Sequence, residues 1–316
     1  MTDSGLLVRI APGSAAVTVD EARAQTRARS AEALADLGPR FSAVEESDQE
    51  VPTPAGPIRI RVVRPTASDR RNSRATVVYF HGGGWMMGDL DTHLAQARRI
   101  AVLADAVVVS VDYRLAPEHR FPAAFDDAAA ATESVAGRLS DFGGGPDLVV
   151  AGDGSGAQLA ASVALARRDV SAPLAAQVLF YPVTDVSGRY VDPQVNAGYM
   201  SRGTSHQRFG LTMEGMVTFA ATYVDEADAG DWRVSPRRAV SFSGVAPAVV
   251  HTSTLDVLRT EGNFYAEDLR AADVDVIARE YPSLNHSYFG VGGVAAVADS
   301  AAAEAASDLA TLLARR

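Results

Sequence analysis

The chain has 316 residues, of which 47% are hydrophobic and 22% charged, and its formal net charge is −10. This composition is typical of a soluble globular enzyme with a large core. The acidic balance argues against a nucleic-acid or anionic-membrane partner, so we expect a small-molecule substrate. The sequence has no cysteine, which excludes disulfides, thiolate catalysis and cysteine metal sites.

The first part of the chain predicts one helix and one strand. No signal peptide or membrane-spanning apolar run is visible, so we expect a cytoplasmic protein. Residues 18–37 are rich in Ala, Arg and Glu and predict a surface helix. The acidic run 45–50 is interpreted as solvated surface. Residues 58–63 alternate apolar and polar side chains, like an edge strand.

The rest of the chain alternates strands with helices. Continuous apolar runs predict strands buried on both faces, as in a parallel sheet, at 75–80, 106–111, 148–151, 176–181, 248–251 and 274–278. Helical segments lie between or after them, at roughly 92–104, 122–138, 155–168, 260–272 and 295–315. This alternation predicts an α/β fold with helices on both faces of a mostly parallel sheet.

A long polar insertion interrupts this alternation at about 187–232 and ends in a helical piece, 213–223. Loops of that length are usually functional. We therefore expect the insertion to form part of a lid, packed with the N-terminal helix.

Three consecutive glycines follow the first buried strand, in the sequence HGGGW at 81–85. Such a run lets the backbone turn sharply and direct several N–H groups at one point, as an oxyanion hole for acyl transfer requires. A flexible surface loop is the alternative. The position at the carboxyl end of a predicted strand, where α/β sites form, favours the functional interpretation.

The segment LVVAGDGSGAQLA at 148–160 predicts a strand, a very tight turn and a helix. In α/β-hydrolases such a turn is the nucleophile elbow, G-x-S-x-G, with the attacking serine between the glycines. Here the outer glycines are Gly152 and Gly156, and the central position is Gly154. The nearest serine, Ser155, comes one residue later.

Taken together, the motifs resemble those of the bacterial hormone-sensitive-lipase-like esterases, an α/β-hydrolase family. HGGGW resembles the family's oxyanion loop, and VDYRLAPEHRFPAA at 111–124 resembles its most recognisable internal stretch. The resemblance extends to DVLRTEG at 256–262, LNHSYF at 284–289 and RVSP at 233–236. It covers the chain from about residue 50 to the C-terminus.

The resemblance implies a role for each matching residue. Asp256 would orient His286, and His286 would be the general base and acid. The N–H groups of Gly82, Gly83 and Ser155 would hold the oxyanion. No metal or organic cofactor is implied, and a homodimer is expected only because family members often dimerise.

The implied fold is a single α/β-hydrolase domain spanning 1–316 with a helical cap. We expect the cap to comprise about 1–50 and about 187–232. The catalytic core would then comprise about 51–186 and 233–316. The substrate pocket would lie under the cap, at the carboxyl ends of the strands.

Because the nucleophile position holds Gly154, the sequence does not determine which reaction the chain catalyses. Loss of a triad serine lowers turnover by about 10⁶-fold, so ester hydrolysis is expected to be impaired or absent. Ser155 is an alternative nucleophile, but it would make a poor elbow, and a serine at a helix start usually caps the helix. The chain is either a disabled esterase or a non-hydrolytic enzyme, such as a cyclase or lyase, that uses His286 and Asp256 as an acid–base pair.

Two further interpretations remain. Gly152, Gly154 and Ala157 also fit the dinucleotide fingerprint G-x-G-x-x-G/A between a strand and a helix. That interpretation leaves the HGGGW, Asp256 and His286 segments unexplained. The other is a small-molecule binding protein on the same fold, like the gibberellin receptors.

Overall fold

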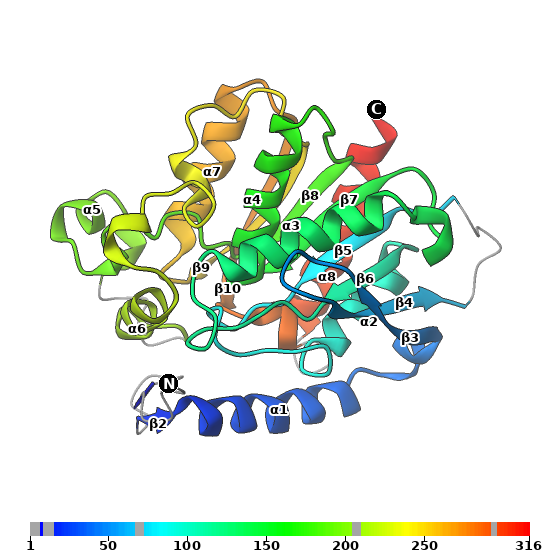
Figure 1. Ribbon diagram of the computed structural model, residues 1–316, viewed down its shortest axis with the longest axis horizontal. Coiled ribbons are helices and arrows are strands. Elements are labelled where there is room, and N and C mark those ends of the chain that lie inside the picture. Colours follow the sequence, from blue (N-terminus) through cyan, green and yellow to red (C-terminus); the bar gives the residue numbers. More distant parts are fainter. Residues whose placement is uncertain (1–6, 9–15, 67–72, 204–209, 292–295) are drawn as a thin grey trace.

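The computed structural model describes residues 7–8, 16–66, 73–203, 210–291 and 296–316. Its centre is an eight-stranded sheet with the order β10-β9-β8-β7-β5-β6-β4-β3 (Figure 1). The strands are β3 (Val44–Val51), β4 (Ile58–Pro65), β5 (Thr76–Phe80), β6 (Val107–Val111), β7 (Leu148–Asp153), β8 (Ala176–Phe180), β9 (Ala248–Leu255) and β10 (Val276–Asn285). No helix among the described residues combines the length and apolar character needed to cross a membrane.

The six strands from β10 to β6 run parallel, and only β4 and β3 are antiparallel to their neighbours. The predicted mostly parallel α/β architecture is therefore confirmed. Because parallel strands end at one edge of the sheet, the loops that follow β5, β7, β8, β9 and β10 gather there.

Helices cover both faces of the sheet. On one face lie α3 (Ala123–Ala136), α4 (Ser155–Asp169) and α7 (Arg259–Ala271), and on the other lie α2 (Leu94–Leu103) and α8 (Ala296–Ala314) (Figure 1). Successive strand residues point to opposite faces, so Val77 belongs to the core under α2 and α8 and Val78 to the core under α3, α4 and α7. Because helices cover both faces of the sheet, successive side chains of the central strands are buried. This explains why these strands appear in the sequence as continuous hydrophobic runs.

The expected edge position of the strand at 58–63 is wrong. β4 pairs with β6 on one side and with β3 on the other, so β3 is the outer strand. β3 contains the acidic run 45–50, whose side chains are mostly exposed although its backbone is fully paired to β4. The sheet thus begins at Val44, ahead of the expected core boundary near residue 51.

Helix α1 (Val19–Ala35) lies along one side of the molecule, outside the two helical layers (Figure 1). Thr18 and Glu21 form a capping box at its start, which satisfies two of the free N-terminal amides. The Arg23 guanidinium pins the helix to the body by donating to both oxygens of Glu118 and to the Met86 carbonyl oxygen. Two short strands, β1 (Leu7–Val8) and β2 (Val17–Thr18), pair antiparallel before the helix.

The predicted helical end of the insertion is confirmed as α6 (Met213–Tyr223). Before it lie η3 (Ser187–Tyr190), α5 (Pro193–Ala197) and η4 (Met200–Arg202). Ser201 ties this region to the turn after β9, because its Oγ donates to the Val257 carbonyl oxygen at 2.8 Å. The insertion is therefore anchored beside Asp256.

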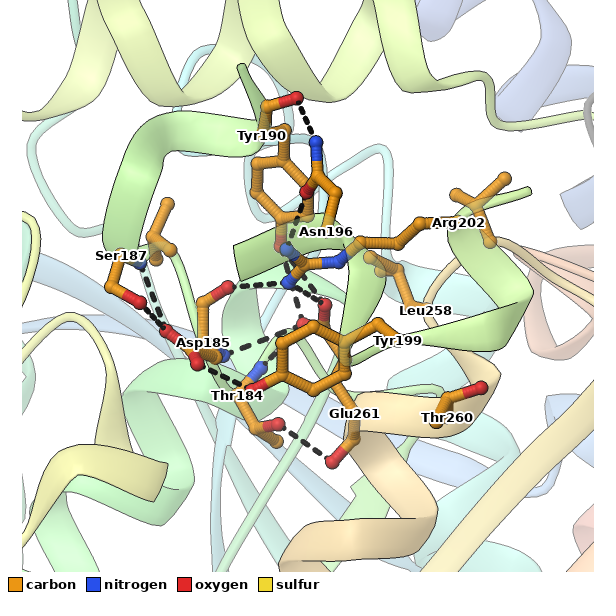
Figure 2. Close-up of polar contacts among 12 residues, drawn as sticks. Thr184, Asp185, Ser187, Tyr190, Asn196, Tyr199, Arg202, Leu258, Thr260 and Glu261 are labelled. Atoms are coloured by element: carbon orange, nitrogen blue, oxygen red, sulfur yellow. Dashed lines mark hydrogen bonds and ion pairs between the residues drawn. The ribbon is translucent and has the colours of Figure 1, made fainter. Parts of the chain in front are cut away.

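A buried ion pair holds the insertion to α7 (Figure 2). Arg202 donates to Glu261 Oε2 at 2.6 Å, and their side chains are 1% and 0% exposed. The rings of Tyr190 and Tyr199 lie 4.2 and 4.0 Å from the guanidinium carbon. Glu261 also accepts the Thr184 amide at 2.8 Å, and Arg202 also donates to the Asp185 carbonyl oxygen at 2.8 Å, so each charge has a further hydrogen bond.

Arg202→Met should destabilise the protein by about 3–5 kcal/mol, because it leaves the Glu261 charge buried without its partner. Equilibrium urea unfolding measures the change. Arg120→Met is the matched control: Arg120 pairs with Asp225 at 2.7 Å, with side chains 39% and 77% exposed. Loss of that surface pair should change the free energy of unfolding by less than about 1 kcal/mol. Equal effects from the two substitutions would contradict an anchoring role for Arg202.

Candidate active site

The loops that follow β5, β7, β9 and β10 bring the expected site residues together at one edge of the sheet. Gly154 follows β7 directly, and Asp256 and His286 follow β9 and β10. The Cβ atom of a side chain at position 154 would lie 3.3 Å from His286 Nε2. Gly154 and His286 therefore face each other, and the first carbon of any side chain at position 154 would contact the imidazole.

The turn at Gly154 depends on backbone contacts that allow no side chain. An added Cβ at Gly152 would lie 2.3 Å from the Gly156 carbonyl, and one at Gly156 would lie 2.0 Å from the Phe80 carbonyl oxygen. Gly154 itself has φ +53° and ψ −113°. A residue with a side chain would be strained in that conformation by about 1–3 kcal/mol.

His286 and Asp256 form a hydrogen-bonded pair. His286 Nδ1 donates to Asp256 Oδ2 at 2.8 Å, and the Asp256 residue is only 1% exposed. The other carboxylate oxygen of Asp256 accepts the Leu258 amide at 2.9 Å. With the Nδ1 proton held by the carboxylate, Nε2 is the free acceptor, and it is the ring atom nearest Gly154. The Tyr181 ring packs on the imidazole, with 4.7 Å between centroids.

The glycine loop differs from the expectation at one position. The Gly82 N–H donates to Asp153 Oδ1 at 2.9 Å, so this amide is already engaged and is not free to hold an oxyanion. Gly83 and Gly84 line the cavity beside Gly154. Gly84 lies directly against Phe219 of α6, since an added Cβ would approach that ring to 2.6 Å.

Ser155 is the first residue of α4, so its amide has no acceptor within the helix. Its hydroxyl oxygen accepts the Trp85 amide at 3.3 Å, and the residue is 2% exposed. No described contact joins this hydroxyl to His286. The geometry places the Ser155 side chain with the glycine loop and not with the base.

A buried aromatic and histidine cluster supports the loop from behind. Tyr113 donates to the His81 carbonyl oxygen at 2.6 Å and stacks on the His81 ring at 4.3 Å between centroids. Burial, with a smaller effect of neighbouring His93, lowers the pKa of His81 to about 4. His81 is therefore neutral at neutral pH and adds no charge behind the loop.

A cavity of about 270 Å³ opens above these residues. Its polar floor contains Gly154, Ser155 and His286, and its apolar wall contains side chains from the insertion and the core, Val183, Leu211, Met216, Phe219 and Leu258. Arg29 of α1 also borders it. Arg29, Met216 and Phe219 belong to no sequence motif, and only the fold brings α1 and α6 over the same edge.

Comparisons with known proteins agree with this arrangement. A family model described as the alpha/beta hydrolase fold matches residues 77–290. "Esterase LipI" of Mycobacterium tuberculosis is 39% identical over 80% of this chain and 78% of its own length. "Ethyl acetate hydrolase" of Pseudomonas putida is 34% identical over 76% of this chain and 74% of its own length.

Solved structures give the same result. The crystal structure of EstE1, a thermostable carboxylesterase cloned from a metagenomic library, has a TM-score of 0.85 and 34% identity, and the match covers 94% of this chain and 98% of that one. A hyperthermophilic esterase from Pyrobaculum calidifontis has a TM-score of 0.84 at 34% identity, with 94% and 92% covered. The chain belongs to the α/β-hydrolase fold family, as a carboxylesterase-type member of the hormone-sensitive-lipase-like esterases.

Proposed function

We propose that this chain binds small carboxylic esters but hydrolyses them poorly or not at all, because Gly154 supplies no nucleophile. The observation that supports this is the distance of 3.3 Å between a Cβ at position 154 and His286 Nε2. A hydroxyl carried on that atom would lie within hydrogen-bonding distance of the base. The rest of an acyl-transfer site surrounds this position.

The remaining groups can still catalyse a slow reaction. His286 would take a proton from a water molecule, and the resulting hydroxide would attack the ester carbonyl carbon. The amides of Gly83, Gly84 and Ser155 would bind the oxyanion that forms. His286 would then return the proton to the departing alcohol, while Asp256 stabilises the imidazolium in between.

A second candidate is a non-hydrolytic reaction that needs only proton transfer and oxyanion binding. The intact Asp256–His286 pair favours it, since Nε2 faces an open space that a substrate atom can occupy. Cyclisation or elimination would use the same base and the same amides. A protein that only binds its ligand would have no use for a buried and aligned pair.

Gly154→Ser should raise hydrolysis of a short p-nitrophenyl ester by about 10³–10⁶-fold, because it completes a triad whose other members are in place. The same substitution should lower the free energy of unfolding by about 1–3 kcal/mol, because serine is strained at φ +53°. Steady-state kinetics and urea unfolding measure the two effects. His286→Ala in the Gly154→Ser background should remove most of the gain.

The second candidate gives a different result in the same experiment. If Gly154→Ser is folded and retains the His286–Asp256 pair but does not hydrolyse short esters, the disabled-esterase proposal is wrong. The open space beside Nε2 then belongs to a substrate atom. Gly154→Ala should in that case block the native reaction nearly as well as Gly154→Ser.

Ser155→Ala tests the alternative nucleophile. The Ser155 hydroxyl contacts the Trp85 amide and not His286, so its removal should leave residual ester turnover within about threefold of the starting rate. A loss of a hundredfold or more would show that Ser155 attacks the ester. Covalent labelling with a fluorophosphonate, read by mass spectrometry, provides an independent check and should leave residue 155 unmodified.

A further inference from the structure

A second cavity, of about 280 Å³, adjoins the catalytic one and shares Gly83, Asp153 and Ser287 with it. It extends beneath α1, so we call it the α1 recess. Its lining is rich in hydrogen-bonding side chains: Arg29 and Ser287, which border both cavities, and Thr26, Ser30, His93 and Gln96, which border only this one. A group bound there would be continuous with a group bound at His286.

Gln96 of α2 lines this recess with a side-chain amide that no described residue hydrogen-bonds. The residue is 6% exposed. An amide that lines an open cavity can donate and accept hydrogen bonds there, with water or with a ligand. The Gln96 amide is therefore available to a ligand that enters the recess.

Arg29 differs from the two other arginines of α1 in its ion pairing. Arg23 pairs with Glu118 at 2.8 Å, and Arg27 pairs with Asp89 at 2.9 Å. Arg29 borders both cavities, yet within the described part of the chain no carboxylate lies at ion-pair distance from it; Nε donates only to the Gln25 carbonyl oxygen, at 3.4 Å. Arg29, an exposed residue, is thus the one of these three arginines that has no carboxylate partner among the described residues.

The described lining of the recess also contains one carboxylate, Asp153, which accepts hydrogen bonds from the protein itself. Asp153 accepts the Tyr79 hydroxyl at 2.6 Å and the Gly82 amide at 2.9 Å, and it is 5% exposed. Burial lowers the pKa of the neighbouring His93, which is therefore neutral at neutral pH. Among the described lining residues, Arg29 is therefore the one cationic side chain, and the oppositely charged Asp153 carboxylate is bound to donors of the protein.

We propose that the α1 recess binds a carboxylate on the substrate, so that the preferred substrates are acyl compounds with an acidic far end, such as half-esters of dicarboxylic acids. Arg29 would supply the charge, and the Gln96 amide together with the hydroxyls of Ser30 and Ser287 would donate hydrogen bonds. Charge-assisted hydrogen bonds are about twice as strong as neutral ones. The assignment of the ester carbonyl to the His286 side of the site rests on the proposed function.

Equilibrium binding tests the proposal on the protein as it stands, without any need for turnover. The probes are the monomethyl esters of succinic, glutaric and adipic acids, each compared with its neutral carboxamide counterpart by isothermal titration calorimetry. At least one acid should bind about tenfold more tightly than its amide. Because the overall negative charge repels every anion, such a preference must come from a local group.

Variants on α1 assign the preference to Arg29. Arg29→Gln should reduce the acid-to-amide ratio to about one, and Arg29→Glu should reverse it. Arg27→Gln is the matched control: it removes the same charge from the same helix but outside the recess, and it should leave the ratio unchanged. A ratio near one in the starting protein, or a preference that survives Arg29→Glu, would overturn the proposal.

Gln96→Met tests the second contact. Since Gln96 has no described hydrogen bond to lose, the melting temperature should stay within a few degrees of the starting value. Binding of acid and amide should both weaken severalfold. Unchanged binding of both would remove Gln96 from the proposal. If Gly154→Ser restores hydrolysis but the monomethyl esters with a free carboxylate and their carboxamide counterparts react equally well, the proposed function stands. The proposed preference for a substrate carboxylate is then wrong.

Discussion

The contact between two backbones at Gly152 and Gly156 is the constraint on which the site depends. Strand β7 and helix α4 can meet at so tight a turn only because neither position carries a side chain, with the Phe80 carbonyl oxygen lying where a Cβ on Gly156 would be. The contact fixes Gly154 at the apex and makes Ser155 the first residue of α4. Every other part of the site is arranged around this turn, whichever residue occupies its apex.

Sequence patterns predicted the parts of the fold that follow from simple periodicity. The apolar runs of the parallel strands were recognisable because helices cover both faces of the sheet, and α6 lies at 213–223 as expected. β3 was not recognisable, because its sequence VEESDQEV is acidic and its strand character comes from pairing with β4. Without β3, β4 looked like an edge, and the start of the sheet was placed too late.

In the candidate site, too, some residues could be predicted from the sequence and others only from the fold. Asp256 and His286 could be placed because each follows a predicted strand, and the HGGGW loop because it follows another. Which amide of that loop is free could not be predicted, because the Asp153 carboxylate binds Gly82 only in the folded protein. Arg29 and Gln96 carry no motif at all. Their significance depends on where α1 and α2 place them in the recess and on the absence of an ion pair to Arg29 and of a side-chain hydrogen bond to Gln96 among the described residues. These are properties of the fold and not of the local sequence.

Glycine at the apex has a further consequence for the history of such a chain. At φ +53°, glycine is more stable than serine by about 1–3 kcal/mol, a sizeable share of the 5–15 kcal/mol that keeps a typical domain folded. Once selection no longer maintains the hydroxyl, thermal stability favours its loss and opposes its return. The change from serine to glycine at the elbow is therefore easier than its reversal, because reversion to serine requires a protein that has first gained stability elsewhere.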